Sequence, residues 1–350
     1  MKFIKIKCTG FILFFLMRLV LVAQLSSPFN KLALTDQAAD YSFIVSGHFH
    51  GGSSNQSTFP AATLLANIDS INALQPAFII SLGDLFTDVN EETVDHYNTS
   101  LFRKLKSPLF NAVGNHDVSN GNKYETLYGK SFYFFTYGKQ LFLLLNTELN
   151  DGDIKGEQLE LVKSALNKAK TGGIKQLFIF SHRPVWAEGN PRYTNIFKDN
   201  TQSKLGAPNF EKDILPLLQQ VHLPIYWFSG SMGSGPASFF YDKNEKDGIT
   251  YIQTAIRDTP RDGVLRVELN QNTVSFKCIS LTGQRLGPLE QFGISYWTKN
   301  VAPEQSFNFR LLPYLTWLMI KHHYFWIGLI TGVILLFLFK LLMKKWGRKK

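Results

Sequence analysis

The chain has 350 residues, 45% of them hydrophobic, which is enough for one large domain or two small ones. The formal net charge is +10, but residues 1–26 carry +4 and residues 321–350 carry +7, so the residues between them carry −1. Because the basic charge is confined to the two ends, the composition argues against a phosphate-backbone partner, and no nucleic-acid binding is expected.

The first 26 residues have the layout of a secretory signal, with a basic start, an apolar stretch over residues 11–23 and polar residues after it. Arg18 interrupts the apolar stretch, and the residues just before position 24 form a mediocre cleavage site. Two alternatives therefore stay open for residues 1–26: a signal peptide that is cleaved, or an N-terminal anchor that is kept.

Between about residues 34 and 297, short apolar runs alternate with helical patterns, which is typical of a layered α/β domain. The last third of this region predicts antiparallel strands joined by tight turns. We therefore expect one domain over residues 27–298. The elements expected before its last third are strand 41–47, helix 60–74, strand 76–84, helix 91–105, strand 108–115, hairpin 131–146, helix 157–169, strand 175–184, helix 211–220 and strand 223–230.

After this domain, residues 299–323 are expected to form a linker, and residues 324–343 match the ~20 apolar residues that a helix needs to cross a bilayer. A basic tail, residues 344–350, follows at once, and the positive-inside rule places it in the cytoplasm. The main domain is then expected on the other side of the membrane, whether that is periplasmic, extracellular or lumenal. Cys278 is the one cysteine left in the domain, so no intramolecular disulfide is expected.

Side chains with metal-binding chemistry follow four of the expected strands, in the segments SGHFHGG, LGDLFTD, VGNHDVS and FSHRPVW. Open α/β sheets build their sites outside the carboxyl ends of the strands, so these loops are expected to meet. His48 and His50 are two residues apart beside glycines and can turn toward one point as imidazole ligands. Asp84 follows a glycine at a strand end, from which a carboxylate can bridge two cations.

The remaining loops add further ligand types. Asn115 offers a carbonyl oxygen, His116 an imidazole, and Asp117 a carboxylate that can hydrogen-bond this imidazole and fix its tautomer. His182 ends another strand. This mixed nitrogen and oxygen set suits Zn, Mn or Fe rather than Ca or an Fe–S cluster. Two such ions ~3.5–4 Å apart would clamp a phosphate and activate a water molecule.

These segments resemble the motifs of the calcineurin-like metallophosphoesterase superfamily, which read D-x-H, G-D-x-x-D, G-N-H-D/E, a lone H and G-H-x-H. The resemblance covers most of residues 40–260, and GNHD at a strand end is its most specific part. It implies a four-layer αββα sandwich of two mixed sheets. The matching stretches are HFH (48–50), GDLFTD (83–88), GNHD (114–117), SHRP (181–184) and GSMG (230–233).

The chain departs from the family pattern in three motifs. His48 stands where the first motif has a ligand aspartate, and Ser231 and Gly233 stand where the last motif has two ligand histidines. In the second motif Thr87 takes the place of the second aspartate, and Asp88 comes one residue late. Positions 231 and 233 are therefore weak or replaced ligand positions.

Position by position, the resemblance implies two divalent ions that share Asp84. The first would be held by His48 and His50, and the second by Asn115 and His182. Three protein ligands and a water are a frequent arrangement at catalytic zinc.

The family mechanism also implies roles for three neighbouring residues. His116 would contact the phosphate or protonate the leaving oxygen, and Asp117 would orient it. Arg183, directly after His182, is a candidate for binding the substrate phosphate.

Two functions follow from the resemblance. The first is a membrane-anchored, outward-facing phosphoesterase acting on a phosphorylated small molecule, and the location adds envelope phospho-compounds to the candidates. The alternative is a catalytically inactive pseudo-phosphoesterase that serves as a binding or scaffold protein with one metal or none, because ligands are missing from the last motif.

Overall fold

The computed structural model describes residues 25–34, 39–52, 55, 57–194, 196–197, 209–231, 238–257, 261–271, 273–299, 312–321 and 323–346. The predicted signal or anchor lies outside the described residues except for its last two positions. The same holds for residues 300–311 of the expected linker.

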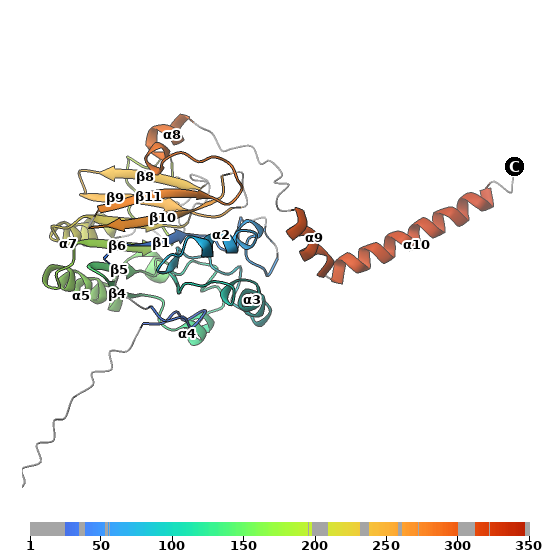
Figure 1. Ribbon diagram of the computed structural model, residues 1–350, viewed down its shortest axis with the longest axis horizontal. Helices are drawn as coiled ribbons and strands as arrows, with labels where there is room; N and C mark the ends of the chain where they lie inside the picture. The colour runs from blue at the N-terminus through green and yellow to red at the C-terminus, as the bar shows by residue number, and fades with distance from the viewer. Residues whose placement is uncertain are drawn as a thin grey trace, which may run out of the picture.

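Two mixed sheets form the body of the protein (Figure 1). The strands are β1 (Tyr41–Ser46), β2 (Ile79–Ser81), β3 (Leu109–Asn111), β4 (Tyr133–Tyr137), β5 (Gln140–Leu144), β6 (Gln176–Ser181), β7 (Ile225–Ser229), β8 (Phe239–Asn244), β9 (Ile249–Thr254), β10 (Gly263–Asn270) and β11 (Thr273–Ser280). One sheet has the order β11-β10-β1-β2-β3 and the other β4-β5-β6-β7-β9-β8.

In each sheet the strands that carry the motif loops run parallel to one another. β1, β2 and β3 are parallel, as are β5, β6, β7 and β9. The expected hairpin 131–146 is present as β4 and β5, and the antiparallel pairs β8·β9 and β10·β11 confirm the prediction for the last third. Because parallel strands end at the same edge, the motif loops gather there.

Helices cover the outer face of each sheet (Figure 1). Alongside the five-stranded sheet lie α1 (Ala62–Leu65), α2 (Ile68–Ala73), α3 (Glu91–Tyr97), the π-helical turn Asn98–Phe102 and α4 (Lys123–Tyr128). Against the six-stranded sheet pack α5 (Glu157–Thr171) and α7 (Leu215–Gln219), the latter preceded by the turn Phe210–Ile214. Two short elements, Leu289–Phe292 and α8 (Ile294–Lys299), follow the last strand.

Three hydrophobic clusters separate four layers. In β1, Phe43 and Val45 face the cluster between the two sheets, whereas Ile44 faces the helices α1–α4. In β6, Phe178 belongs to the cluster between the sheets and Ile179 to the cluster under α5. This alternation is what two-sided burial of a strand requires. The protein is therefore a four-layer αββα sandwich, as the sequence predicted.

The expected helix 60–74 is interrupted in the structure, and α1 and α2 replace it. Asn67 lies at the interruption, where its buried side-chain amide donates hydrogen bonds to the carbonyl oxygens of Thr63 (2.7 Å) and Leu281 (2.8 Å). Such side-chain bonds to the backbone compete with continuation of a helix. The bond to Leu281 also ties the helical layer to the end of β11.

The C-terminal part holds two helices, α9 (Leu312–Lys321) and α10 (His323–Trp346). The window His323–Leu341 of α10 is long and apolar enough to cross a membrane, and none of it is buried inside the structure. Figure 1 shows α10 standing clear of the two sheets. The predicted span 324–343 thus coincides with a candidate membrane helix, but the expected linker 299–323 contains a helix of its own.

Candidate metal centre

Backbone contacts between the loops after β1 and β2 bring the first two motifs together. The amide of His48 donates to the carbonyl oxygen of Gly83 (3.0 Å), and the amide of His50 donates to that of Asp84 (3.4 Å). His48 and Asp84 both have left-handed backbones, with φ of 53° and 51°. For residues other than glycine this conformation is strained and recurs at functional sites.

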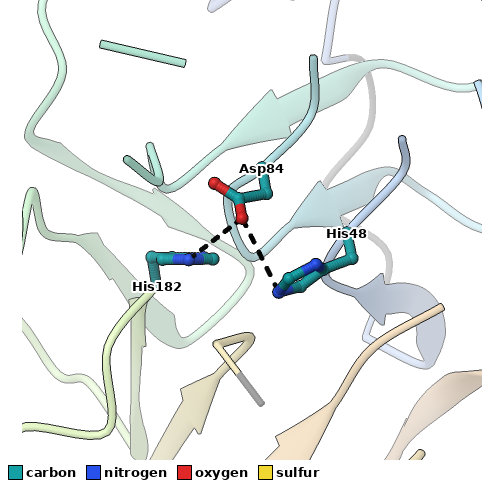
Figure 2. A group of neighbouring side chains, drawn as sticks. All are labelled: His48, Asp84 and His182. Carbon is teal, nitrogen blue, oxygen red and sulfur yellow. Dashed lines mark ion pairs between the residues drawn. The ribbon is translucent and has the colours of Figure 1, made fainter. Parts of the chain in front are cut away.

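Three imidazoles surround one oxygen of Asp84. The Oδ2 atom lies 3.4 Å from Nε2 of His182, 3.6 Å from Nε2 of His50 and 3.7 Å from Nε2 of His48. Figure 2 shows His48 and His182 approaching this oxygen from different loops. The other oxygen, Oδ1, accepts a hydrogen bond from the amide of His116 (3.1 Å). Asp84 is 2% exposed, so the sequence-predicted bridging position is a buried point of convergence.

The potential ligand atoms fall into two groups that share Asp84. The first contains His48, Asp84 and His182, and the second contains His50, Asp84 and His116; within each group the atoms lie within 4.8 Å of one another. The expected pairing of His48 with His50 stays a prediction, because the ring centroids of these two residues are 5.3 Å apart. The centroids of His48 and His182 are 5.4 Å apart, and those of His50 and His116 are 4.9 Å apart.

Two backbone carbonyls fix the orientation of two of these rings. Nδ1 of His182 lies 2.9 Å from the carbonyl oxygen of Leu82, and Nδ1 of His116 lies 2.8 Å from that of Thr87. A ring N–H donating to a carbonyl leaves the second nitrogen unprotonated and available as a ligand. Neither carbonyl was predicted, because every residue has one and the sequence carries no signal for it.

Several ring nitrogens of the cluster are buried and make no hydrogen bond within the described protein: Nε2 of His48, both nitrogens of His50 and Nε2 of His182. An unsatisfied buried polar group costs about 1–3 kcal/mol. A divalent cation would satisfy such nitrogens, and imidazole with carboxylate is a donor set that Zn, Mn and Fe accept. The residues therefore fit a metal centre.

The electrostatics of the cluster favour the protonation states that metal binding needs. Burial lowers the pKa of the His48 imidazole to about 3, so this ring is neutral near pH 7. Burial alone would raise the pKa of the Asp84 carboxyl, but the surrounding His182, His50 and His48 outweigh burial and hold this pKa well below its usual range. A neutral imidazole beside an ionised carboxylate is the ligand form of both groups.

Asp117 does not orient His116 as predicted. Its carboxylate accepts hydrogen bonds from the amides of Gly114 (2.9 Å) and Phe86 (3.0 Å) and from the side-chain amide of Asn111 (3.1 Å). Burial, followed by the negative charge of Asp84, raises the pKa of Asp117 to about 6. Asp117 thus braces the turn that carries Asn115 and His116, and the carbonyl of Thr87 takes over the orienting role.

The next positions to place are those at which the chain departs from the family motifs, together with Asn115. Ser231 is half-buried, and its amide donates to the carbonyl oxygen of His182 (2.7 Å). Gly233 lies outside the described residues. Asn115 is exposed, and Asp88 accepts hydrogen bonds from Ser119 (2.9 Å) and Asn90 (3.1 Å), which stabilise the loop after β2.

Two arginines adjoin the centre in different ways. Arg183 is held by Glu148 through three hydrogen bonds of 2.6–3.0 Å, so its charge is largely neutralised within the protein. Arg257 was not predicted. The residue before it, Ile256, donates its backbone N–H to the carbonyl oxygen of Gly47 (3.0 Å). The positive charge of Arg257 is among the causes that lower the pKa of the His48 imidazole.

No protein-family model and no curated protein matches the chain. Solved structures do. Purple acid phosphatase PPD1 from yellow lupin (Lupinus luteus) seeds is 12% identical with a TM-score of 0.51, and the match covers 76% of this chain and 54% of that one. A dimetal phosphatase from Danio rerio is 14% identical with a TM-score of 0.50, covering 69% and 96% of the two chains. GAP50, the anchor in the inner membrane complex of Plasmodium, is 14% identical with a TM-score of 0.49, covering 72% and 89%.

The first two matches show that the chain shares the sandwich fold of these two phosphatases. The chain spans about half the length of the lupin phosphatase that it matches. Identities this low establish a shared fold and leave activity to be argued from the site itself.

Proposed function

We propose that the protein is a metal-dependent phosphoesterase, tethered to a membrane by α10, with its sandwich outside the cytoplasm. The observation that supports this most is the convergence of His48, His50 and His182 on Asp84, with ring nitrogens that are buried and unsatisfied. Because such groups are costly to leave unsatisfied, a bound cation is a physical reason for their presence here.

One ion position would consist of His48, Asp84 and His182, of which Asp84 and His182 are buried and His48 is nearly so. A second position would use His50 and Asp84, with the exposed Asn115 as an added oxygen ligand. Bound divalent ions would supply Lewis-acid activation of water and neutralisation of phosphate charge. Zn, Mn and Fe are the candidates by donor type.

His116 is the residue to which we assign proton transfer to the leaving oxygen. It is half-buried, whereas the ligand histidines His50 and His182 are buried. The hydrogen bond between Nδ1 and the carbonyl of Thr87 holds the ring in place and leaves Nε2 for the substrate. Asp84 adds a further constraint by accepting the backbone amide of His116.

For binding of the substrate phosphate, Arg183 and Arg257 are both candidates. Arg183 is paired with Glu148, and Arg257 lies near enough to His48 for its positive charge to lower the pKa of that imidazole. The substrate is a phosphate ester, either a soluble small molecule or a phospho-compound of the cell envelope.

Turnover of a chromogenic phosphodiester by the full chain in detergent with Mn²⁺ tests the proposal, with Asp84→Asn as the matched variant. Metal content is measured on both proteins. Bound metal with turnover that the substitution abolishes supports the phosphoesterase. Bound metal without turnover in the wild type supports the pseudo-phosphoesterase, for which the serine at position 231 is the specific indication. Absence of bound metal would refute the metal centre altogether.

A further inference from the structure

The short helix α9 precedes the candidate membrane helix and has the sequence LPYLTWLMIK. The side chains of Leu312, Met319 and Ile320 are 49%, 57% and 44% exposed. α9 meets α10 directly, and the indole N–H of Trp326 donates to the carbonyl oxygen of Ile320 (2.8 Å). Figure 1 shows the two helices joined at an angle. An almost wholly apolar helix therefore leaves large side chains uncovered.

Length separates the roles of the two helices. α10 has 24 residues and is about 36 Å long, which already exceeds the ~30 Å hydrocarbon core of a bilayer. α9 has 10 residues and is about 15 Å long, too short to span. Isolated helices below ~12–15 residues are marginal in water, so α9 needs an apolar environment to persist.

Position in the chain indicates what provides this environment. α9 ends at Lys321 and α10 begins at His323, so the end of α9 lies where the span enters the membrane. Tyr324 and Trp326, both exposed, are residue types enriched at membrane interfaces. The sequence places Arg310 before α9 and Lys321 at its end, with no acidic residue between them, which suits a surface of phospholipid headgroups.

We propose that α9 is a membrane-surface helix that lies in the headgroup region of the leaflet from which α10 enters. The phospholipid interface then covers the apolar side of α9, and helices of this kind bury that side by ~5–10 Å. Residues 300–311 then form the whole connection between the sandwich and the membrane surface. Twelve residues span at most ~40 Å, so Lys299, at the end of α8, would lie within about that distance of the membrane surface.

A single fluorescent label tests this in the full chain reconstituted into nanodiscs of phosphatidylcholine with some phosphatidylglycerol. Cys8→Ser and Cys278→Ser remove the native thiols, and Met319→Cys carries an environment-sensitive dye. We expect the emission of the dye at position 319 to be blue-shifted relative to its emission in water. We also expect a quencher attached to the lipid near its headgroup to quench this dye more strongly than a quencher near the end of the lipid acyl chain. Lys163→Cys, at an exposed position on α5, is the control and is expected to emit as in water.

Three results would overturn the proposal. Water-like emission at position 319 would show that α9 is uncovered. A water-soluble quencher is added in a further measurement. If the dye is protected from this quencher and is also not quenched by either lipid-attached quencher, α9 packs on the sandwich. One place for it would be the groove of about 620 Å³ that Val89, Val94 and Leu127 help to line. Stronger quenching by the deep lipid would make α9 a continuation of the span. Ile320→Cys, labelled in the same way, guards against a local effect of the Met319 substitution.

Discussion

His182 and Asp84 are separated by 98 positions in the chain, yet Nε2 of the imidazole lies 3.4 Å from Oδ2 of the carboxylate. The opposite ring nitrogen of His182 is held by the carbonyl of Leu82, two residues before Asp84. The loop after β2 thus supplies both the carboxylate that faces the ring and the acceptor that orients it. The same loop therefore fixes how the His182 ring faces Asp84.

The different settings of His182 and His116 lead to different expected effects of alanine substitution. His182→Ala removes a buried ligand, so we expect metal affinity to fall by more than the ~10–100-fold that is usual for loss of a supporting partner. His116→Ala should leave the metal content close to that of the wild type and reduce turnover by ~10²–10⁴-fold, as loss of a general acid does. Metal analysis after dialysis and steady-state rates measure both quantities. Equal loss of metal in the two variants would make His116 a ligand.

Gly114→Ala is expected to disrupt the metal centre from the backbone side. A Cβ atom at this position would lie 2.3 Å from Oδ1 of Asp84 and 2.5 Å from its backbone nitrogen. Because these neighbours are backbone and a fixed carboxylate, Asp84 must move, and we expect loss of metal binding together with a destabilisation of about 1–3 kcal/mol.

Gly121→Ala is the matched control for this substitution. Position 121 has a φ of +62° and open space around an added Cβ, so the substitution should cost about 1 kcal/mol through backbone strain alone. Metal affinity and thermal unfolding are measured for both variants. If Gly114→Ala bound metal as tightly as Gly121→Ala, the close packing of Gly114 on Asp84 would not matter for the centre.

The general architecture could be predicted from the sequence because periodicity and strand-end rules are local. The hairpin β4–β5 and the helix α5 follow from alternation and helical spacing, and both were expected at nearly the observed bounds. His48, His50, Asp84 and His182 were expected to meet because they lie at the carboxyl ends of strands. The structure brings these four together.

The orientation of the imidazoles and the partners of Asp117 could not be predicted from the sequence. They depend on backbone atoms and on which of several possible hydrogen-bond partners each side chain contacts. The carbonyls of Leu82 and Thr87 orient two imidazoles, and no residue type marks such a role. Asp117 next to His116 suggested a carboxylate–imidazole pair, but three N–H donors compete for this carboxylate and occupy it. The pairing of ligands within the cluster likewise depends on which loops face each other across the sheets.

Cys278 on β11 should be unreactive at neutral pH. Burial, with a smaller effect of the negative charge of Glu290, raises the pKa of its thiol from 9.0 to about 12. The folded protein therefore keeps a proton that the unfolded chain loses between pH 9 and 12, so this group favours folding below pH 9 and ceases to do so as the pH rises through 12.

Alkylation of the Cys8→Ser protein by iodoacetamide measures this shift. At pH 8 we expect a rate roughly 1000-fold below that of the protein unfolded in guanidinium, since the thiolate is the reactive species and the pKa difference is about three units. The rate should rise about tenfold per pH unit up to pH 11. A plateau near pH 9 would contradict the raised pKa.

Restoring a ligand at the degenerate last motif is the most direct test of what the chain has lost there. The amide of Ser231 is hydrogen-bonded to the carbonyl of His182, so this position is fixed next to the cluster. If the family resemblance holds here, Ser231→His should add a fourth protein ligand and increase Mn²⁺ affinity by at least about tenfold. Ser231→Gln, of similar size but with a weaker metal donor, is the control. Titration of both variants with Mn²⁺ measures the difference, and equal affinities would show that position 231 no longer faces the metal centre.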